Sequence, residues 1–460
     1  MNAITLTIIL LCLSSLAYYL GRRRAFSIVQ GRVRELHSLP AYYGLYTAIW
    51  CGIPALLLVG FWTAFEPNVI THLVVSGMPD EIRNQGADRL NLVVNDIKNL
   101  VSGNIMSRPA SPEIQAAADH YNHLQTISRA AMSAVALSFA LIAASLVLTR
   151  VRARQRARNA VETILEVILI ICSSIAILTT IGIVLSVLFE SLRFFHKVPL
   201  TDFLFGLEWS PQTAIRADQV GSSGAFGFVP LFVGTMLISF IAMVVAVPIG
   251  LMSAIYLAEY SGPKFRATAK PLLEILAGIP TVVYGFFAAL TVAPLIRESG
   301  SFLGLDVASE SALAAGLVMG IMIIPFVSSL SDDVINAVPQ SLRDGAYGLG
   351  ATRSETIRKV IFPAALPGIV GSILLAVSRA IGETMIVVMA AGLSANLTVN
   401  PLEAVTTVTV QIVTLLTGDQ EFDSSKTLAA FALGLILFLV TLTLNVIALH
   451  VVRKYREQYE

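Results

Sequence analysis

The chain has 460 residues, of which 55% are hydrophobic and only 13% are charged, and its mean hydropathy is +0.76. Soluble domains carry roughly 25% charged residues, so this composition excludes a water-soluble monomer. The net charge of +1 provides no basic field for nucleic acid, and we expect no nucleic-acid partner. Cys12, Cys51 and Cys172 lie inside apolar runs without metal-ligand spacing, and we interpret them as small core residues.

Long apolar runs recur along the chain and predict nine membrane-spanning helices, because about 20 apolar residues of helix cross a bilayer core about 30 Å thick. The fold class expected is therefore an all-α polytopic membrane protein. The runs cover residues 4–20, 41–64, 129–149, 161–190, 229–257, 271–296, 312–330, 365–392 and 429–451.

Basic residues at the ends of these runs predict the orientation. Arg22, Arg23 and Arg24 follow the first run and no basic residue precedes it, which indicates a retained anchor with its N-terminus outside. Nine crossings then place the C-terminus in the cytoplasm. The segments assigned to the cytoplasm hold 20 Lys and Arg residues against 10 outside, as the positive-inside rule requires.

The loop at 66–128 is the only polar segment long enough to fold outside the membrane. Leu90, Val94 and Ile97 belong to a helical stripe of apolar residues, and Ser111 with Pro112 predicts the start of a helix running into the third span. The loop either contacts a partner or only shields the ends of two spans. Asp119, His120 and His123 have too few neighbouring ligands for a metal site, and we expect none.

Five arginines between Arg150 and Arg158 divide the sequence into an N-terminal extension, 1–160, and a six-span section, 161–460. Such a run beside an apolar segment is typical of a topogenic signal that also contacts anionic membrane lipid. Binding of nucleic acid or of a specific partner is the alternative.

The segment 339–363 is too polar for lipid, yet it has helical spacing on both sides of Gly350 and a proline, Pro363, as a helix stop. Two short helices joined at a glycine are expected. Such a projection can enter a groove on a soluble partner and transmit a rigid-body movement. An ordinary surface loop is the alternative.

Arg379 and Glu383 lie inside the eighth predicted span, four residues apart, and are expected to share a helix face. Charges there cost at least about 2.5 kcal/mol each on insertion scales, so they normally face a partner or a water-filled path. One hypothesis is a structural ion pair. The other is an anion site, in which the guanidinium holds two oxyanion oxygens and the carboxylate accepts a proton that phosphate, unlike sulfate or molybdate, still carries.

Small residues and prolines mark two further spans. Gly316 and Gly320 predict close helix packing in the seventh span, with a kink at Pro325. In the sixth span Glu274 either lines a path or is hydrated near the helix end.

The polar segment resembles the EAA loop of ABC-importer permeases. Asp344, Gly345 and Ala346 stand where that pattern has Glu-Ala-Ala, Gly350 matches its glycine, and Pro363 its terminal proline. The spacing is preserved without a gap. The resemblance implies a type I permease core of six helices plus about three N-terminal spans. It also implies that residues 341–363 dock on an ATPase, a role carried to Arg343, Asp344, Gly350 and Pro363.

Three further segments resemble the permeases of bacterial phosphate-specific ABC importers, and Met385 with Trp209 favours the PstC-type subunit. The segments are Arg379–Met385, Leu276–Gly285 and Phe228–Thr235. The resemblance implies inorganic phosphate as substrate and Arg379 and Glu383 as the residues that bind it. It further implies a second, PstA-like permease, an ATPase dimer, an extracytoplasmic phosphate-binding protein, and a bacterial inner-membrane location.

The sequence contains no Gly-Lys pair and hence no P-loop, so we expect a transport subunit that is not an enzyme and holds no cofactor, with ATP bound by a partner. Two alternatives remain at this point. One is a permease for another oxyanion, such as sulfate or molybdate. The other is a membrane sensor or receptor that uses the 66–128 loop.

Overall fold

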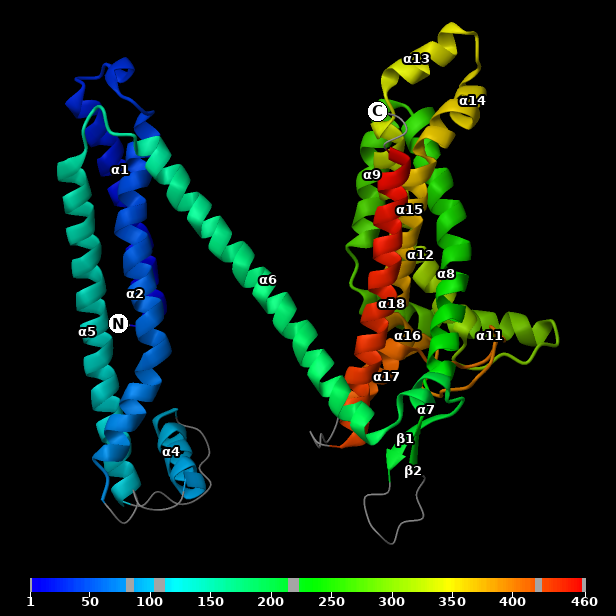
Figure 1. The fold of residues 1–460 in the computed structure, drawn as a ribbon, viewed down its shortest axis with the longest axis horizontal. Helices are drawn as coiled ribbons and strands as arrows, with labels where there is room; N and C mark the ends of the chain where they lie inside the picture. Colours follow the sequence, from blue (N-terminus) through cyan, green and yellow to red (C-terminus); the bar gives the residue numbers. More distant parts are fainter. Residues whose placement is uncertain (1, 80–86, 103–111, 214–222, 418–423, 457–460) are drawn as a thin grey trace. The chain divides into compact units, whose positions relative to one another are not determined.

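The computed structural model of the chain describes residues 2–79, 87–102, 112–213, 223–417 and 424–456. These residues form two compact units, Met1–Leu178 and Thr179–Glu460. The division falls inside α6 (Ala157–Lys197), the helix that carries the chain from one unit into the other (Figure 1).

The predicted all-α membrane class and the number of spans are confirmed. Nine helices in the described parts of the chain are long and apolar enough to cross a bilayer, and each contains most of one predicted run. They are Ala3–Ile28, Pro40–Ser76, Pro112–Arg150, Ala157–Lys197, Val229–Tyr260, Thr281–Phe302, Ala312–Ala337, Arg353–Ile381 and Ser425–Lys454.

The N-terminal unit is built on three long helices, α1 (Ala3–Ile28), α2 (Pro40–Ser76) and α5 (Pro112–Arg150), with the short η1 (Val33–Glu35) after α1. Their shared core includes buried Cys51, as predicted. Cys12 and Cys172 are exposed instead, so the core prediction is wrong for them. The physical reason is that apolar residues of a membrane helix also cover its outer faces, where they meet lipid.

A shorter helix, α4 (Ala87–Ser102), forms a satellite core with the ends of α2 and α5. Ile97 of α4 is buried there with Ile70 of α2 and Tyr121 of α5. The apolar stripe of the 66–128 loop therefore packs as predicted, and α5 runs unbroken into the third span. Ser111, the predicted helix cap, lies outside the described residues.

In the second unit α8 (Val229–Ile255), α12 (Ala312–Ala337), α15 (Phe362–Ile381) and α18 (Ser425–Arg456) run side by side (Figure 1). The predicted glycine packing is present between α12 and α8. A Cβ atom at Gly316 would lie 2.7 Å from Ile241, and one at Gly320 would lie 2.9 Å from the carbonyl oxygen of Ala242.

Two predicted spans are interrupted where a single helix was expected. The run 271–296 is divided into α9 (Pro263–Ala277) and a second helix of three pieces: α10 (Thr281–Phe287), the π-turn η3 (Ala288–Val292) and α11 (Ala293–Phe302). The break falls at Gly278–Pro280, since Pro280 has no N–H to donate the next backbone hydrogen bond of the helix. Figure 1 shows α11 running across the direction of α8.

The run 365–392 is interrupted as well. α15 ends at Ile381 with Gly382 as its C-cap, and a separate short helix, α16 (Met385–Ala390), follows. Arg379 and Glu383 therefore do not share the face of one helix, and that prediction is wrong.

Several small elements escaped the hydropathy pattern. They are α7 (Leu200–Phe205), the antiparallel pair β1 (Trp209–Thr213) and β2 (Ser223–Phe226), and α17 (Val408–Leu416). The ring of Phe194 makes T-shaped contacts with the rings of Phe203 and of Phe226, the last residue of β2. The indole N–H of Trp209 donates to Gln411 Oε1 at 2.9 Å, which joins the hairpin to α17.

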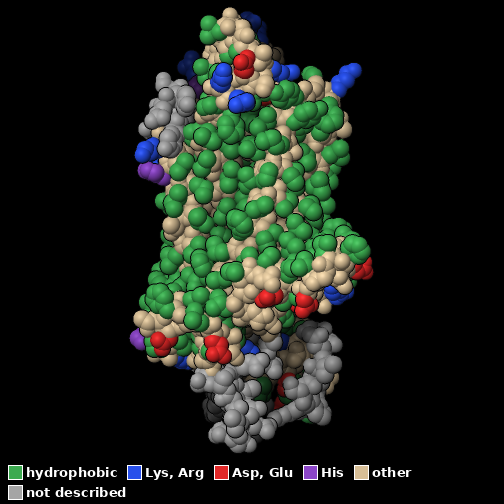
Figure 2. All heavy atoms as spheres, turned by 90° about the vertical axis from the view of Figure 1, so that its right-hand side faces the viewer, with side chains coloured by type: hydrophobic (Ala, Val, Ile, Leu, Met, Phe, Trp, Pro, Cys, Tyr) green, Lys and Arg blue, Asp and Glu red, His purple; other side chains and the backbone are tan. Residues whose placement is uncertain are grey.

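The surface of the second unit has the distribution of a membrane protein. Figure 2 shows a broad band of hydrophobic side chains across the middle of the visible face. Lys and Arg gather at the end that carries α13 (Gln340–Gly348), while Asp and Glu are more frequent toward the opposite end. This is the pattern expected of a bundle that crosses a bilayer.

Candidate functional site

Arg379 lies in the last turn of α15, at the break before α16. Its side chain is exposed, and its guanidinium carbon lies 5.3 Å above the ring centroid of Phe326 from α12. No described carboxylate lies within ion-pair distance of it. A cation stacked on an aromatic ring keeps its N–H fork free for a planar or tetrahedral anion.

Glu383 lies beyond the end of α15 and caps α16. Its Oε1 atom accepts hydrogen bonds from the backbone N–H groups of Met385 at 3.0 Å and Ile386 at 3.4 Å. The structure records no ion pair between Glu383 and Arg379, which removes the self-neutralising pair from the two hypotheses. The second carboxylate oxygen, Oε2, has no hydrogen bond or ion pair from the part of the chain that the structure describes, which leaves it available to an outside donor.

The peptide of Glu383 is fixed from α17, an element that sequence reasoning missed. Thr409 Oγ1 donates to the carbonyl oxygen of Glu383 at 2.8 Å and lies 3.0 Å from the hydroxyl of Thr407. Thr407 also caps α17 by accepting from the N–H of Val410. The signal was the run Thr406-Thr407-Val408-Thr409 ahead of an apolar stretch, a frequent start of a helix.

The predicted pair of short helices joined at Gly350 is present. α13 is followed by Gly350, whose φ of +82° is the left-handed conformation that glycine adopts without strain, and then by α14 (Arg353–Thr356). A capping box begins the second helix: the side chains of Thr352 and Glu355 each accept a hydrogen bond from the other's backbone N–H. The pKa of the Glu355 carboxyl is lowered, chiefly by the hydrogen bond from the Thr352 N–H.

Asp344 and Arg343 are neighbours in α13 with opposite placements. Asp344 is exposed, and its side chain accepts a hydrogen bond from Gln340 on its own helix. Arg343 points into the bundle, where it donates to Glu259 Oε1 at 3.0 Å and to the carbonyls of Ile335 and Val338 at 2.8 and 2.7 Å. Arg343 therefore fastens α13 to the end of α12 and to the π-turn η2 (Tyr256–Tyr260).

Pro363 does not stop a helix, and that prediction is wrong. The chain continues from α14 through the π-turn η4 (Ile357–Ile361) directly into α15, with Pro363 in the first turn of α15. A wide π-turn immediately before a proline accommodates its missing N–H, so the second helix of the polar segment and the eighth span are one continuous helix.

A second charge cluster, also missed, surrounds Asp332 near the same end of α12. Asp332 is 2% exposed and accepts from Arg266 at 2.9 Å with both oxygens, from Lys270 at 2.8 Å and from Asn336 at 2.9 Å. The hydrogen bond from Lys270 to Asp332 raises the pKa of that ammonium group. The sequence signal was the acidic pair Asp332-Asp333 at the end of an apolar run.

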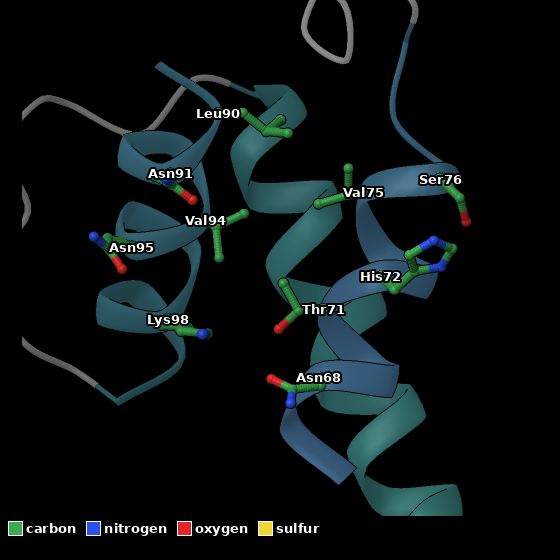
Figure 3. A pocket seen from close by; sticks show the side chains of 10 residues that line it. All are labelled: Asn68, Thr71, His72, Val75, Ser76, Leu90, Asn91, Val94, Asn95 and Lys98. Atoms are coloured by element: carbon green, nitrogen blue, oxygen red, sulfur yellow. The ribbon is translucent and has the colours of Figure 1, made fainter. Parts of the chain in front are cut away.

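A polar cavity of about 680 Å³ lies in the N-terminal unit between α2 and α4. Figure 3 shows Asn68 and Thr71 of α2 and Val94 of α4 pointing into it. The hydroxyl of Thr71 is buried there without a hydrogen-bond partner among the described residues. Neither Arg379 nor Glu383 lines this cavity, so cavity size alone does not locate the predicted anion site.

Comparisons with known proteins relate both units to one kind of transporter. Residues 7–179 match a family described as "Phosphate ATP-binding cassette transporter", and residues 246–457 match "Binding-protein-dependent transport system inner membrane component". A probable ABC transporter permease of Bacillus subtilis, YqgH, is 32% identical over 59% of this chain and 84% of its own length. The phosphate transport system permease PstC 1 of Mycobacterium bovis is 33% identical over 55% of this chain and 81% of its own.

The chain belongs to the PstC-type family of ABC-importer permeases. This confirms the resemblance drawn from the EAA-like segment and from the Arg379–Met385 motif. It also gives the N-terminal extension, for which the motifs implied nothing, a family of its own. As a member, the chain is a multi-pass transport subunit that works with an ATPase and with other subunits.

The structure gathers the six predicted site residues at two separate places. Arg379 and Glu383 flank the break between α15 and α16, whereas Arg343, Asp344, Gly350 and Pro363 lie on or after α13. α15 links the two places directly, because Pro363 lies in its first turn and Arg379 in its last turn.

Proposed function

We propose that this chain is the membrane-spanning subunit of an ATP-driven importer for inorganic phosphate and forms its path by alternating access. Section 161–460 pairs with a second, PstA-like permease, and two ATPase subunits hydrolyse the ATP on the cytoplasmic side. A phosphate-binding protein delivers the anion from outside. The bundle lies in the bacterial inner membrane with its N-terminus outside and its C-terminus inside.

One observation carries the proposal: Arg379 is a guanidinium at a helix break within a predicted membrane span, without a carboxylate partner among the described residues. A charge there is costly unless a ligand or water compensates it. Two N–H groups of a guanidinium match two oxygens of a tetrahedral oxyanion. The names of the relatives, which include phosphate transport, support phosphate as the anion.

Glu383 supplies selectivity in this proposal. Its Oε1 atom already accepts two backbone hydrogen bonds, so a donor on the anion meets Oε2. Phosphate near neutral pH has an O–H to donate, whereas sulfate and molybdate have only acceptors. An unprotonated carboxylate beside fully ionised oxyanions repels them, which favours phosphate.

Residues 341–363, which include α13, are the docking segment for the ATPase in this proposal. Leu349 is 91% exposed and Tyr347 and Asp344 are exposed beside it, so one apolar and acidic face of the segment is open to a soluble partner. Arg343 holds the opposite face against the bundle. A push on α13 therefore reaches the membrane helices through a buried contact.

The test is uptake of radiolabelled phosphate into proteoliposomes that contain the complete complex. We expect ATP-dependent uptake that excess sulfate or molybdate does not reduce. Glu383→Gln, in assembled complexes, should lose uptake. Equal competition by sulfate would instead identify a permease for a broader class of oxyanion, and full uptake by Glu383→Gln would remove the selectivity role.

A further inference from the structure

The cytoplasmic end of α12 holds two separate elements through charged side chains. On one side Arg343 of α13 bonds to the carbonyls of Ile335 and Val338. On the other side Asp332, one turn earlier on α12, holds Arg266 and Lys270 of α9. The docking segment and α9 are thus fastened to the same short stretch of one helix.

α9 depends on this charged attachment to an unusual degree. None of its residues is buried, and none belongs to any hydrophobic core cluster of the described chain. Leu272 and Ile275 on α9 are 57% and 65% exposed. Asp332, by contrast, is almost wholly buried beneath Arg266 and Lys270. These ion pairs therefore fix the position of α9 on α12.

The far end of α9 leads to the helix that Glu383 caps. After the break at Gly278–Pro280, Tyr284 of α10 donates its hydroxyl back to the carbonyl of Leu276 at 2.8 Å. α10 lies directly on α16: a Cβ atom at Gly285 would lie 3.1 Å from the carbonyl oxygen of Met385. A displacement of α9 therefore presses on the first residue of α16.

We propose that Asp332 couples the ATPase to the anion site by transmitting movement of α12 to α9 and, through α10, to α16. This inference rests on the proposed function. Asp332 is a positioning residue here and touches no substrate. The ATPase, bound to α13, moves the end of α12. The ion pairs of Asp332 make α9 move with α12, and this movement changes the backbone around Glu383.

The test uses the complete complex in proteoliposomes and measures phosphate uptake and ATP hydrolysis together. Asp332→Asn keeps the shape of the side chain but removes its charge. Asp333→Asn is the matched control, because Asp333 is adjacent, its side chain is 65% exposed, and within the described residues it forms a single ion pair, with Lys270 at 3.3 Å. We expect Asp332→Asn to lower the phosphate moved per ATP about tenfold or more, a typical coupling effect, and Asp333→Asn to leave the ratio unchanged.

A ratio unchanged by Asp332→Asn would overturn the inference. If that variant does not assemble, the double variant Arg266→Gln and Lys270→Gln is measured in the same way, since it removes both ion pairs to α9 and leaves Asp332 bonded to Asn336. An unchanged ratio in that variant would also overturn the coupling role.

A probe on α9 separates this inference from the proposed function. A spin label at Leu272→Cys, in a chain without the exposed Cys12 and Cys172, reports on α9 whatever the substrate is. We expect ATP to change its spectrum in the parent and not in Asp332→Asn. An equal response in both would contradict the coupling role, whereas absent phosphate uptake by the parent would contradict only the function.

Discussion

Charged side chains occur in two settings in the second unit, and their partners differ. Near the end of α12 that lies beside α13, Asp332 and Glu259 are buried and bonded to opposite charges, Glu259 to the half-buried Arg343. At the break after α15, Arg379 lies against an aromatic ring, and no carboxylate of the described residues is within ion-pair distance of it. The difference separates charges that hold helices together from a charge that we propose meets a ligand. Substitutions at the first place should cost stability as well as coupling, and substitutions at the second place should cost uptake alone.

The largest loss of stability is expected for Arg343→Met. It leaves Glu259 buried without its partner, at a cost of roughly 3 to 5 kcal/mol. Thermal unfolding in detergent measures the effect. Arg358→Met is the control, because Arg358 is an exposed arginine of η4. Equal unfolding temperatures for the two variants would contradict the anchoring role of Arg343.

A smaller loss is expected for Gly350→Ala, about 1 to 2 kcal/mol, because a side chain at φ +82° is strained. The turn should open and the ATPase should no longer co-purify. Gly348→Ala is matched, since both positions have open space around a Cβ atom but only Gly350 has a positive φ. Retention of the ATPase by both variants would remove Gly350 from the docking segment.

Thr409→Val should cost about 1 kcal/mol through loss of the hydrogen bond to the carbonyl of Glu383. Because that bond fixes the peptide of Glu383, a residue of the proposed anion site, the concentration for half-maximal uptake should rise more than the maximal rate falls. Thr409→Ser keeps the hydroxyl and should behave as the parent. Identical uptake curves for Thr409→Val and the parent would show that α17 does not position Glu383.

The smallest effect is local and depends on pH. The folded state lowers the pKa of Glu355, so the stabilisation of the α14 cap is complete above the usual value of about 4.3 and is lost as pH falls through the lowered pKa. Amide exchange of residues 353–356 should therefore speed up, beyond its intrinsic pH dependence, in that acidic range. In the Thr352→Ala variant these amides should exchange fast both above the usual pKa and in the acidic range. A pH-independent protection factor in the parent would contradict the capping box.

The sequence predicted the spans well because their signal is local. Each run of apolar residues needs only its own length to form a membrane helix, and the glycines at 316 and 320 needed only their spacing. The breaks at Gly278–Pro280 and Gly382 were missed because hydropathy does not change there. α17 and the β1–β2 hairpin are too short to stand out from their surroundings.

The candidate site was predictable in part. A charged pair inside an apolar run drew attention to Arg379 and Glu383, but only the fold shows that a helix break separates them. The direction of Arg343 depends on Glu259, 84 residues away. The cluster around Asp332 likewise joins α9 and α12 across 62 and 66 residues. Contacts across such separations have no spacing pattern in the sequence.

The most direct test of the account is phosphate uptake by complexes with Arg379→Gln, measured beside their unfolding temperature. The account predicts that uptake is lost while assembly and unfolding temperature stay as in the parent. Arg379→Lys, which keeps the charge without the fork, should retain a small part of the uptake. Full uptake by Arg379→Gln, or loss of uptake only together with unfolding, would contradict the claim that Arg379 meets the anion.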